Sequence, residues 1–196
     1  MTDENLVVQV VVGMMLLALL GFGILTAVRH YRRYRARRAL FRAFEAASVA
    51  LLRDVLIPDG SDGHLHIDFL LLTGRGLLVV DFRDVDGVVF GGEHMKEWAV
   101  MNRSARSTFL NPLETLYDRV AAVRALAGDV PVDGRIVFTE RAQFPKGRPP
   151  RVLRIASLEA EYPAPEPGST THPAERYRAA WDEVARVAEP SPLGRR

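Results

Sequence analysis

The sequence has no cysteine and almost no lysine. Without a thiol the chain can form neither a disulfide nor a metal site with thiolate ligands, so both classes of stabilisation are excluded. The absence of cysteine suits a reducing compartment. Lys96 and Lys146 are the two lysines, and nearly every cation is therefore an arginine, a bias that usually reflects genome composition.

The chain as a whole also has no large excess of positive or negative charge. The formal net charge is +2, from 26 basic and 24 acidic residues. Residues 29–42 nevertheless carry seven arginines and no acid, and the rest of the chain is net acidic. The basic character is therefore local, and it does not indicate a nucleic-acid-binding surface over the whole protein.

Long hydrophobic runs are absent except for one, from Leu6 to Val28, which is uncharged and mostly aliphatic. As a helix this run would be about 35 Å long, enough to cross about 30 Å of hydrocarbon. A cleaved signal peptide is the competing interpretation, but it favours a basic start and a shorter apolar core, whereas Asp3 and Glu4 precede this run. We therefore expect an uncleaved transmembrane helix.

The arginines after the run predict its orientation and one partner. Positively charged flanks remain in the cytoplasm, so we expect a cell-membrane protein with a short extracytoplasmic N-terminus and a cytoplasmic C-terminal domain. The cluster would also contact anionic lipid headgroups. A nucleic-acid contact by the same arginines is the alternative.

The remaining chain divides into one folded domain and a tail. We expect the following segments: 1–5 outside the membrane, 6–28 as the span, 29–39 as the Arg-rich juxtamembrane segment, 40–160 as the domain, 161–173 as a Pro-rich linker, and 174–196 as an amphipathic helix and tail.

Hydrophobic periodicity within the domain alternates between helical and strand-like. An apolar stripe predicts a helix from Tyr34 to Val55, and Asn111-Pro112-Leu113-Glu114 is typical of a capped helix start. The buried stripe of this second helix is expected to comprise Leu113, Leu116, Tyr117, Val120, Val123 and Leu126. Strands are expected at 65–72, 77–82, 88–90, 135–139 and 152–156, the first two joined by a tight turn at 73–76. This order predicts an α/β domain with a mixed sheet flanked by helices.

The first hairpin carries the residues best suited to chemistry. Alternation along a strand places Asp81 and Arg83 on one face, and pairing of the hairpin could bring Asp68 beside Asp81. Two carboxylates at one sheet edge can hold Mg²⁺, and a nearby cation can stabilise phosphate charge. The simpler alternative is that Asp81 and Arg83 form an exposed ion pair. A Zn²⁺ site formed by His64, His66 and Asp68 is a further alternative.

Residues 40 to about 140 resemble the nuclease-related domain (NERD) family, a relative of the restriction-endonuclease-like PD-(D/E)XK group. The resemblance rests on an ordered series that covers about half the chain: Glu45 in a helix, His66-Ile67-Asp68 with the leucines that follow, a glycine turn, Asp81-Phe82-Arg83, Gly87, Gly91, Trp98 and Asn111-Pro112-Leu113. It implies a restriction-endonuclease-like fold with Asp68 and Asp81 as Mg²⁺ ligands, and with Glu45 assisting them.

The chain departs from the family pattern at the position of the catalytic lysine. Arg83 stands where the family has a lysine that positions or activates the attacking water. Arginine stays charged and can stabilise a transition state, but it is a poor general base. His66 in place of Glu or Gln is a second departure.

These departures favour a degenerate member of the family. We expect a membrane-anchored domain that binds nucleic acid or a protein partner with weak or no cleavage, and that uses no small-molecule cofactor. The alternatives are a non-catalytic interaction module and an active Mg²⁺-dependent nuclease.

Overall fold

The computed structural model describes residues 14–15, 20–28, 41–103, 105–163 and 173–192. The chain forms two compact units, Met1–Arg42 and Ala43–Arg196. In the first unit, residues 14–15 and 20–28 are helical. Within the described ranges no helix is long and apolar enough to cross a membrane. Most of the predicted span, and all of the predicted Arg-rich segment 29–39, lie outside the described residues.

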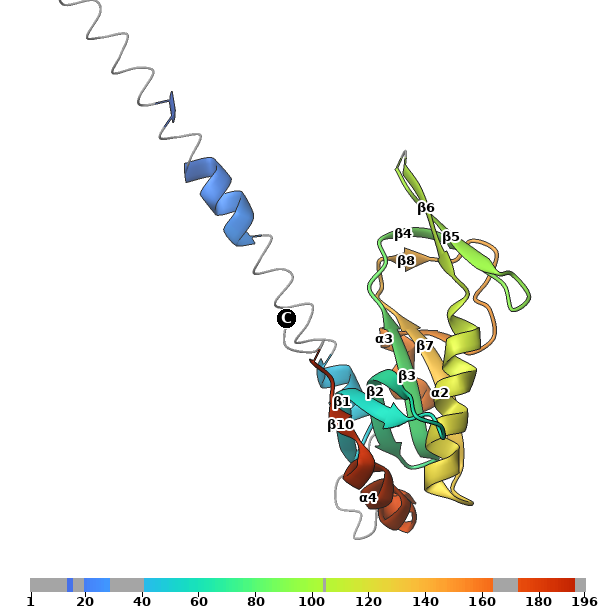
Figure 1. Ribbon diagram of the computed structural model, residues 1–196. Coiled ribbons are helices and arrows are strands. Elements are labelled where there is room, and N and C mark those ends of the chain that lie inside the picture. Colours follow the sequence, from blue (N-terminus) through green and yellow to red (C-terminus); the bar gives the residue numbers. More distant parts are fainter. Residues whose placement is uncertain (1–13, 16–19, 29–40, 104, 164–172, 193–196) are drawn as a thin grey trace, which may run out of the picture. The chain divides into compact units, whose positions relative to one another are not determined.

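The second unit is built on a six-stranded mixed sheet with the order β10-β1-β2-β3-β7-β9 (Figure 1). Its strands are β1 (Ala50–Pro58), β2 (His64–Thr73), β3 (Gly76–Arg83), β7 (Val132–Phe138), β9 (Val152–Arg154) and β10 (Glu189–Pro190). β1, β2 and β3 pair antiparallel, whereas β3, β7 and β9 pair parallel. The predicted mixed α/β sheet is thus confirmed, and the β2–β3 hairpin turns where it was expected, with Thr73 opposite Gly76.

A second, four-stranded sheet has the order β6-β5-β4-β8. It comprises β4 (Gly87–Phe90), β5 (Glu97–Asn102), β6 (Ala105–Leu110) and β8 (Ala142–Gln143). Only β4 was expected from the sequence. The β5–β6 hairpin escaped prediction because β6 (ARSTFL) is exposed along nearly its whole length and shows no alternation of apolar and polar residues.

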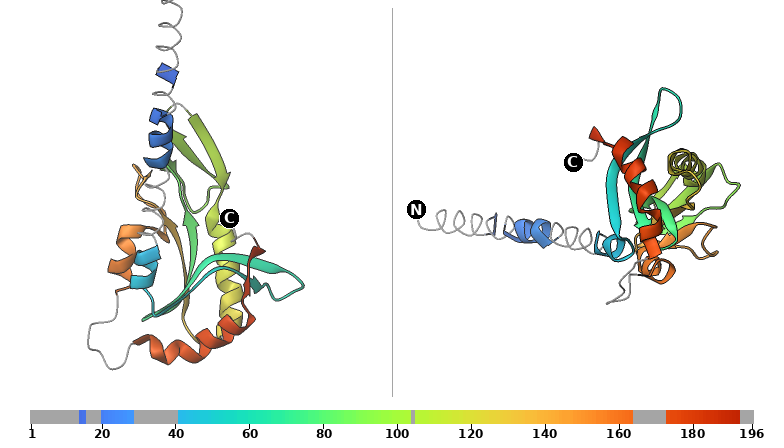
Figure 2. Two further views of the ribbon diagram at one scale, coloured as in Figure 1. Left: turned by 90° about the vertical axis from the view of Figure 1, so that its left-hand side faces the viewer. Right: turned by 90° about the horizontal axis from the view of Figure 1, so that it is seen from below.

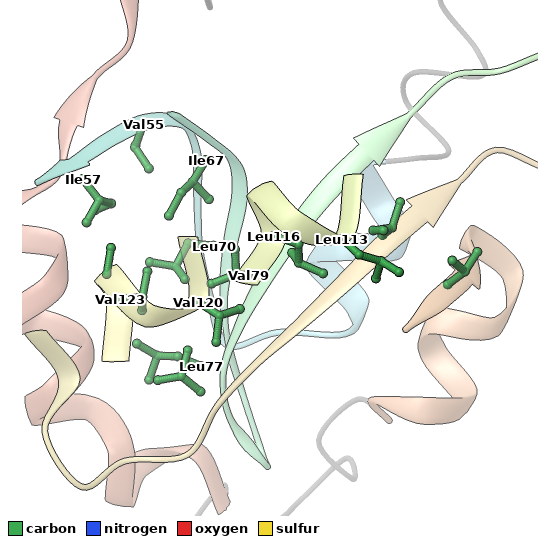
Figure 3. Packing of buried hydrophobic residues seen from close by; sticks show 14 of the residues in the cluster. Val55, Ile57, Ile67, Leu70, Leu77, Val79, Leu113, Leu116, Val120 and Val123 are labelled. Carbon is green, nitrogen blue, oxygen red and sulfur yellow. The ribbon is translucent and has the colours of Figure 1, made fainter. Parts of the chain in front are cut away.

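Helices cover both faces of the six-stranded sheet (Figure 2). The long helix α2 (Pro112–Ala127) buries Leu116, Val120 and Val123 in the main core (Figure 3). Asn111 caps it as predicted, since its side-chain oxygen accepts a hydrogen bond from the Leu113 N–H at 3.0 Å. Tyr117, expected in the buried stripe, is instead 41% exposed. Its ring instead contacts Arg151, whose guanidinium carbon lies 5.6 Å from the ring centroid.

The helix predicted from Tyr34 to Val55 is wrong in its second half. Residues 41–46 are helical, but β1 begins at Ala50. The aliphatic residues Leu51, Leu52 and Val55 fit a strand as well as a helix, since a short apolar run does not distinguish the two. Pairing along the whole of β2 decides for the strand.

The C-terminal segments complete the large sheet. The predicted strand at 152–156 ends early, because helix α3 (Ile155–Glu161) begins directly after β9. Residues 164–172 of the predicted linker lie outside the described residues. The expected C-terminal helix appears as the 3-10 helix η1 (Pro173–Tyr177) followed by α4 (Arg178–Val187), with Trp181 buried.

The glycine pair after β4 provides a test of packing. A Cβ atom on Gly91 would lie 2.3 Å from the ring of Trp98, which is fully buried, whereas one on Gly92 would meet nothing closer than the Met95 sulfur at 3.4 Å. Gly91→Ala should therefore lower the free energy of unfolding by about 1–3 kcal/mol. Gly92→Ala should change it by less than about 0.5 kcal/mol. Urea unfolding followed by tryptophan fluorescence measures both, and equal effects would contradict the packing described.

Candidate functional site

The β2–β3 hairpin brings the two candidate carboxylates together. Pairing ends at Phe69 opposite Val80, so the next positions along the two strands are Asp68 and Asp81. Residues opposite each other in an antiparallel pair share a face. For this pair it is the face that α2 covers, because Leu70 and Val79, the residues two further along, belong to the core beneath α2. The predicted proximity of Asp68 and Asp81 follows from this register.

Asp68 replaces a missing main-chain partner at the end of the hairpin. Its Oδ2 accepts a hydrogen bond from the Phe82 N–H at 2.8 Å, beyond the last paired residue of β2. Burial raises the pKa of Asp68 above its usual range, and repulsion from Asp81 adds to this, although the Phe82 N–H acts in the opposite direction. Binding of a metal ion at Asp68 would require the ionised form of this carboxyl.

His66 of β2 lies between the carboxylate of Asp68 on its own strand and that of Asp54 on the neighbouring β1. Its Nδ1 is 3.4 Å from Asp68 Oδ1 and its Nε2 is 3.7 Å from Asp54 Oδ1. Nε2 is buried and has no hydrogen-bond partner among the described residues. His66 thus faces acids where the family pattern has Glu or Gln, and in its charged form it can offset part of their negative charge.

Asp81 is fully buried and is held by two guanidinium groups. Arg83 forms a two-pronged contact, with Nε 2.5 Å from Oδ1 and Nη2 2.9 Å from Oδ2. Arg119 of α2 places Nη1 2.5 Å from Oδ2. A buried carboxylate requires such partners, because an unpaired charge away from water is strongly unfavourable. Asp81 and Arg83 do form the ion pair considered from the sequence, but the Asp81 carboxylate is buried. Arg119 is a third member of the group.

The described side chains do not fit a Mg²⁺ ion. Mg²⁺ requires oxygen ligands at about 2.0–2.1 Å in near-octahedral geometry, and both oxygens of Asp81 already accept guanidinium N–H groups. Oδ2 of Asp68 accepts the Phe82 N–H. An ion could reach this position only if Asp81 released both arginines. Mg²⁺ binding at Asp68 and Asp81 stays a prediction, and the hydrogen bonds to these carboxylates are unfavourable for it.

The other predicted site residues do not complete a metal centre. Glu45 lies in the short helix at 41–46 and is exposed. Within the described part of the chain, no three His, Cys, Asp or Glu side chains gather in a way that could hold a metal. Neither Glu45 with the two aspartates nor the alternative set of His64, His66 and Asp68 forms such a group among these residues.

Arg119 is the site residue that the sequence analysis missed. It lies three residues after Leu116 and four before Val123, within the stripe that faces the sheet. A cation at such a position needs an acidic partner, which is a signal that the sequence does contain. The signal was hidden because arginine is abundant throughout the chain.

Because Asp81 is buried and paired with two arginines, its replacement should lower the free energy of unfolding strongly. Asp81→Asn should lower the free energy of unfolding by about 3 kcal/mol, because Arg119 and Arg83 lose their counter-charge. Asp84→Asn is the matched control, since its pair with Arg141 is half exposed at both ends and should contribute at most about 1 kcal/mol. Adding Arg119→Met to Asp81→Asn should recover stability. Equal effects of the two Asn variants in urea unfolding would contradict this account.

The raised pKa of Asp68 predicts an unusual pH dependence. The folded state holds this proton more tightly than the unfolded chain, whose pKa is near 3.8. The free energy of unfolding should therefore fall as pH rises through 3.8 toward the raised value, and Asp68→Asn should remove this loss.

Asp133 is the control of opposite sign. Burial raises its pKa, but the Gly134 N–H, Arg135 and Arg151 outweigh this and lower it overall. Asp133→Asn should therefore lose stability relative to the parent as pH rises toward and above 3.8. Urea unfolding across an acidic pH series measures both differences, and slopes of the same sign for the two variants would refute the assignment.

A family match covers the part of the chain that forms this site. The sequence profile of the nuclease-related domain matches residues 32–139, which is more than half of the chain. No curated protein and no solved structure matches the chain significantly. The matched range ends directly after β7, so it includes Asp68, Asp81, Arg83 and Arg119. The chain therefore belongs to the nuclease-related domain (NERD) family.

Proposed function

We propose that this protein is a membrane-anchored member of the family whose catalytic position is closed by arginines, and that it binds nucleic acid without efficient cleavage. One observation carries the proposal: the buried Asp81 carboxylate is engaged by Arg83 and Arg119 at 2.5–2.9 Å. In the family pattern this position supplies a metal ligand, and metal-dependent phosphodiester cleavage would need that carboxylate to be free to bind the ion.

The chemistry of the two arginines supports binding over cleavage. A guanidinium can neutralise Asp81 as a metal would, but it brings no bound water and lowers no water pKa. Arg83 also cannot act as the general base, because it stays protonated. Neither arginine therefore replaces the nucleophile-generating step of the family reaction.

The exposed part of Arg83 supports contact with phosphate. Its side chain is 34% exposed, and the structure gives its Nη1 no hydrogen-bond acceptor among the described residues. Arginine N–H groups match the geometry of phosphate oxygens. Such a contact is independent of base sequence and weakens as salt rises.

The membrane anchor is the second part of the proposal. It is supported by the uncharged run from Leu6 to Val28 and by the arginines that follow it without any acid to residue 42. A positively charged flank of this kind orients the protein with its second unit in the cytoplasm.

The first experiment tests cleavage and metal binding by the full chain in detergent. The parent should bind plasmid and single-stranded DNA equally with EDTA or Mg²⁺ and should cleave neither, and Mn²⁺ should give no bound signal by electron paramagnetic resonance. Arg83→Lys combined with Arg119→Gln should bind Mn²⁺, because Asp81 is then open and a lysine stands at the family position. Arg141→Lys combined with Arg148→Gln makes the same exchange at exposed positions and should resemble the parent.

Two outcomes would overturn the proposal. Cleavage by the parent that disappears in Asp81→Ala would identify an active metal-dependent nuclease despite Arg83. No binding of either DNA at low salt would instead favour a module that acts through a protein partner.

A further inference from the structure

The β5–β6 hairpin has one buried face and one face that nothing in the described chain covers. Trp98 and Val100 are buried, and Trp98 stacks on Phe138 of the large sheet with 6.4 Å between ring centroids. Met101 pairs with Arg106 on the opposite face, which Leu110 shares by alternation along β6. β6 is the edge strand, and the hairpin extends beyond the large sheet (Figure 1).

Exposed apolar side chains gather on this hairpin. Among the described residues from Ala43 onward, four large hydrophobic side chains are exposed: Met95 (45%), Met101 (47%), Leu110 (76%) and Tyr117 (41%). Three of the four belong to the hairpin or to the loop that leads into it. Clustered exposure of this kind marks a contact surface, whereas scattered single residues do not.

The unpaired cations of the second unit gather in the same segment. From Ala43 onward, the described structure gives Lys96, Arg103 and Arg106 no side-chain hydrogen bond, ion pair or ring contact, whereas every other lysine and arginine there has an interaction of one of these kinds. The sequence has no acid between Trp98 and Leu110. Glu97 pairs across the hairpin with Leu110 and therefore lies on the outer face at its base, but neither Glu97 nor Glu93 forms an ion pair with any of the three cations.

We infer that the outer face of the β5–β6 hairpin, together with its turn and the loop that leads into it, docks on the surface of a bilayer containing anionic lipid. Lys96, Arg103 and Arg106 supply charge complementary to headgroup phosphates and carboxylates, and Met95, Met101 and Leu110 supply apolar area for the interface below them. A nucleic acid would neutralise the cations but would leave the methionines and Leu110 in water. The lipid surface accounts for both sets of side chains, so it is the occupant that the observations favour.

Because the chain has no cysteine, a single introduced cysteine can carry a label that reports docking of the hairpin. Met101→Cys gives one labelling site for an environment-sensitive fluorophore in the full chain. The labelled chain is combined with nanodiscs of phosphatidylcholine alone, or of phosphatidylcholine with phosphatidylserine, each carrying a lipid-borne quencher. We expect a blue shift and quenching in the anionic discs and little of either in the neutral ones. Tyr117→Cys, at the fourth exposed apolar position, should show neither.

Charge variants separate local docking from general attraction. Replacing Lys96, Arg103 and Arg106 by Gln should lower the docked-to-undocked ratio about a hundredfold, because each cation at an anionic surface contributes about fivefold to binding. Replacing the exposed Arg148, Arg176 and Arg186 by Gln removes the same charge elsewhere and should leave quenching at position 101 unchanged.

The readout is the environment of position 101 and does not depend on how the chain enters the disc or on whether the Asp81 site is catalytic. Equal signals at positions 101 and 117 would overturn the inference. So would equal quenching in neutral and anionic discs. A spectral change at position 101 that requires added oligonucleotide and no lipid would assign the face to nucleic acid instead.

Discussion

Asp81 imposes the constraint on which the site depends, because it places a carboxylate where no water reaches it. The charge lies between the large sheet and α2, and it is offset by one arginine from each: Arg83 from β3 and Arg119 from α2. The same helix is seated by close packing, since a Cβ on Gly134 would lie 2.6 Å from Val120 Cγ2. Electrostatics and packing thus hold α2 in one position against the sheet.

If the proposed loss of cleavage is correct, this arrangement shows how a nuclease-related fold would persist without its chemistry. A carboxylate pair at the end of a hairpin needs positive charge whether or not the protein is a catalyst. A divalent ion supplies that charge together with a bound, activated water, whereas guanidinium groups supply the charge alone. Replacement of such an ion by Arg83 and Arg119 would keep the buried charge compensated and would remove the activated water. Stability and catalysis would then depend on different groups at this site.

The parts of the fold that local patterns determine were predictable from the sequence. The β2–β3 hairpin followed from alternation and a glycine turn, and with its register came the proximity of Asp68 and Asp81. The Asn111 cap followed from its side chain and the proline after it. Long-range pairing decided the rest: β1 becomes a strand because β2 lies beside it, and Arg119 reaches Asp81 across 38 positions of sequence. No local period carries that information.

The large sheet carries the Asp81 site, whereas the small sheet carries the exposed β5–β6 hairpin. The inner face of the small sheet packs on the main core through Trp98 and Phe138, and this contact does not involve Asp81. The guanidinium carbon of Arg83 lies 5.9 Å from the ring of Phe109, which pairs with Trp98, so the Asp81 site packs against the inner face of the hairpin. Met101, Arg106 and Leu110 lie on the opposite face. A surface contact built on the outer face could therefore be acquired or retained independently of the catalytic residues.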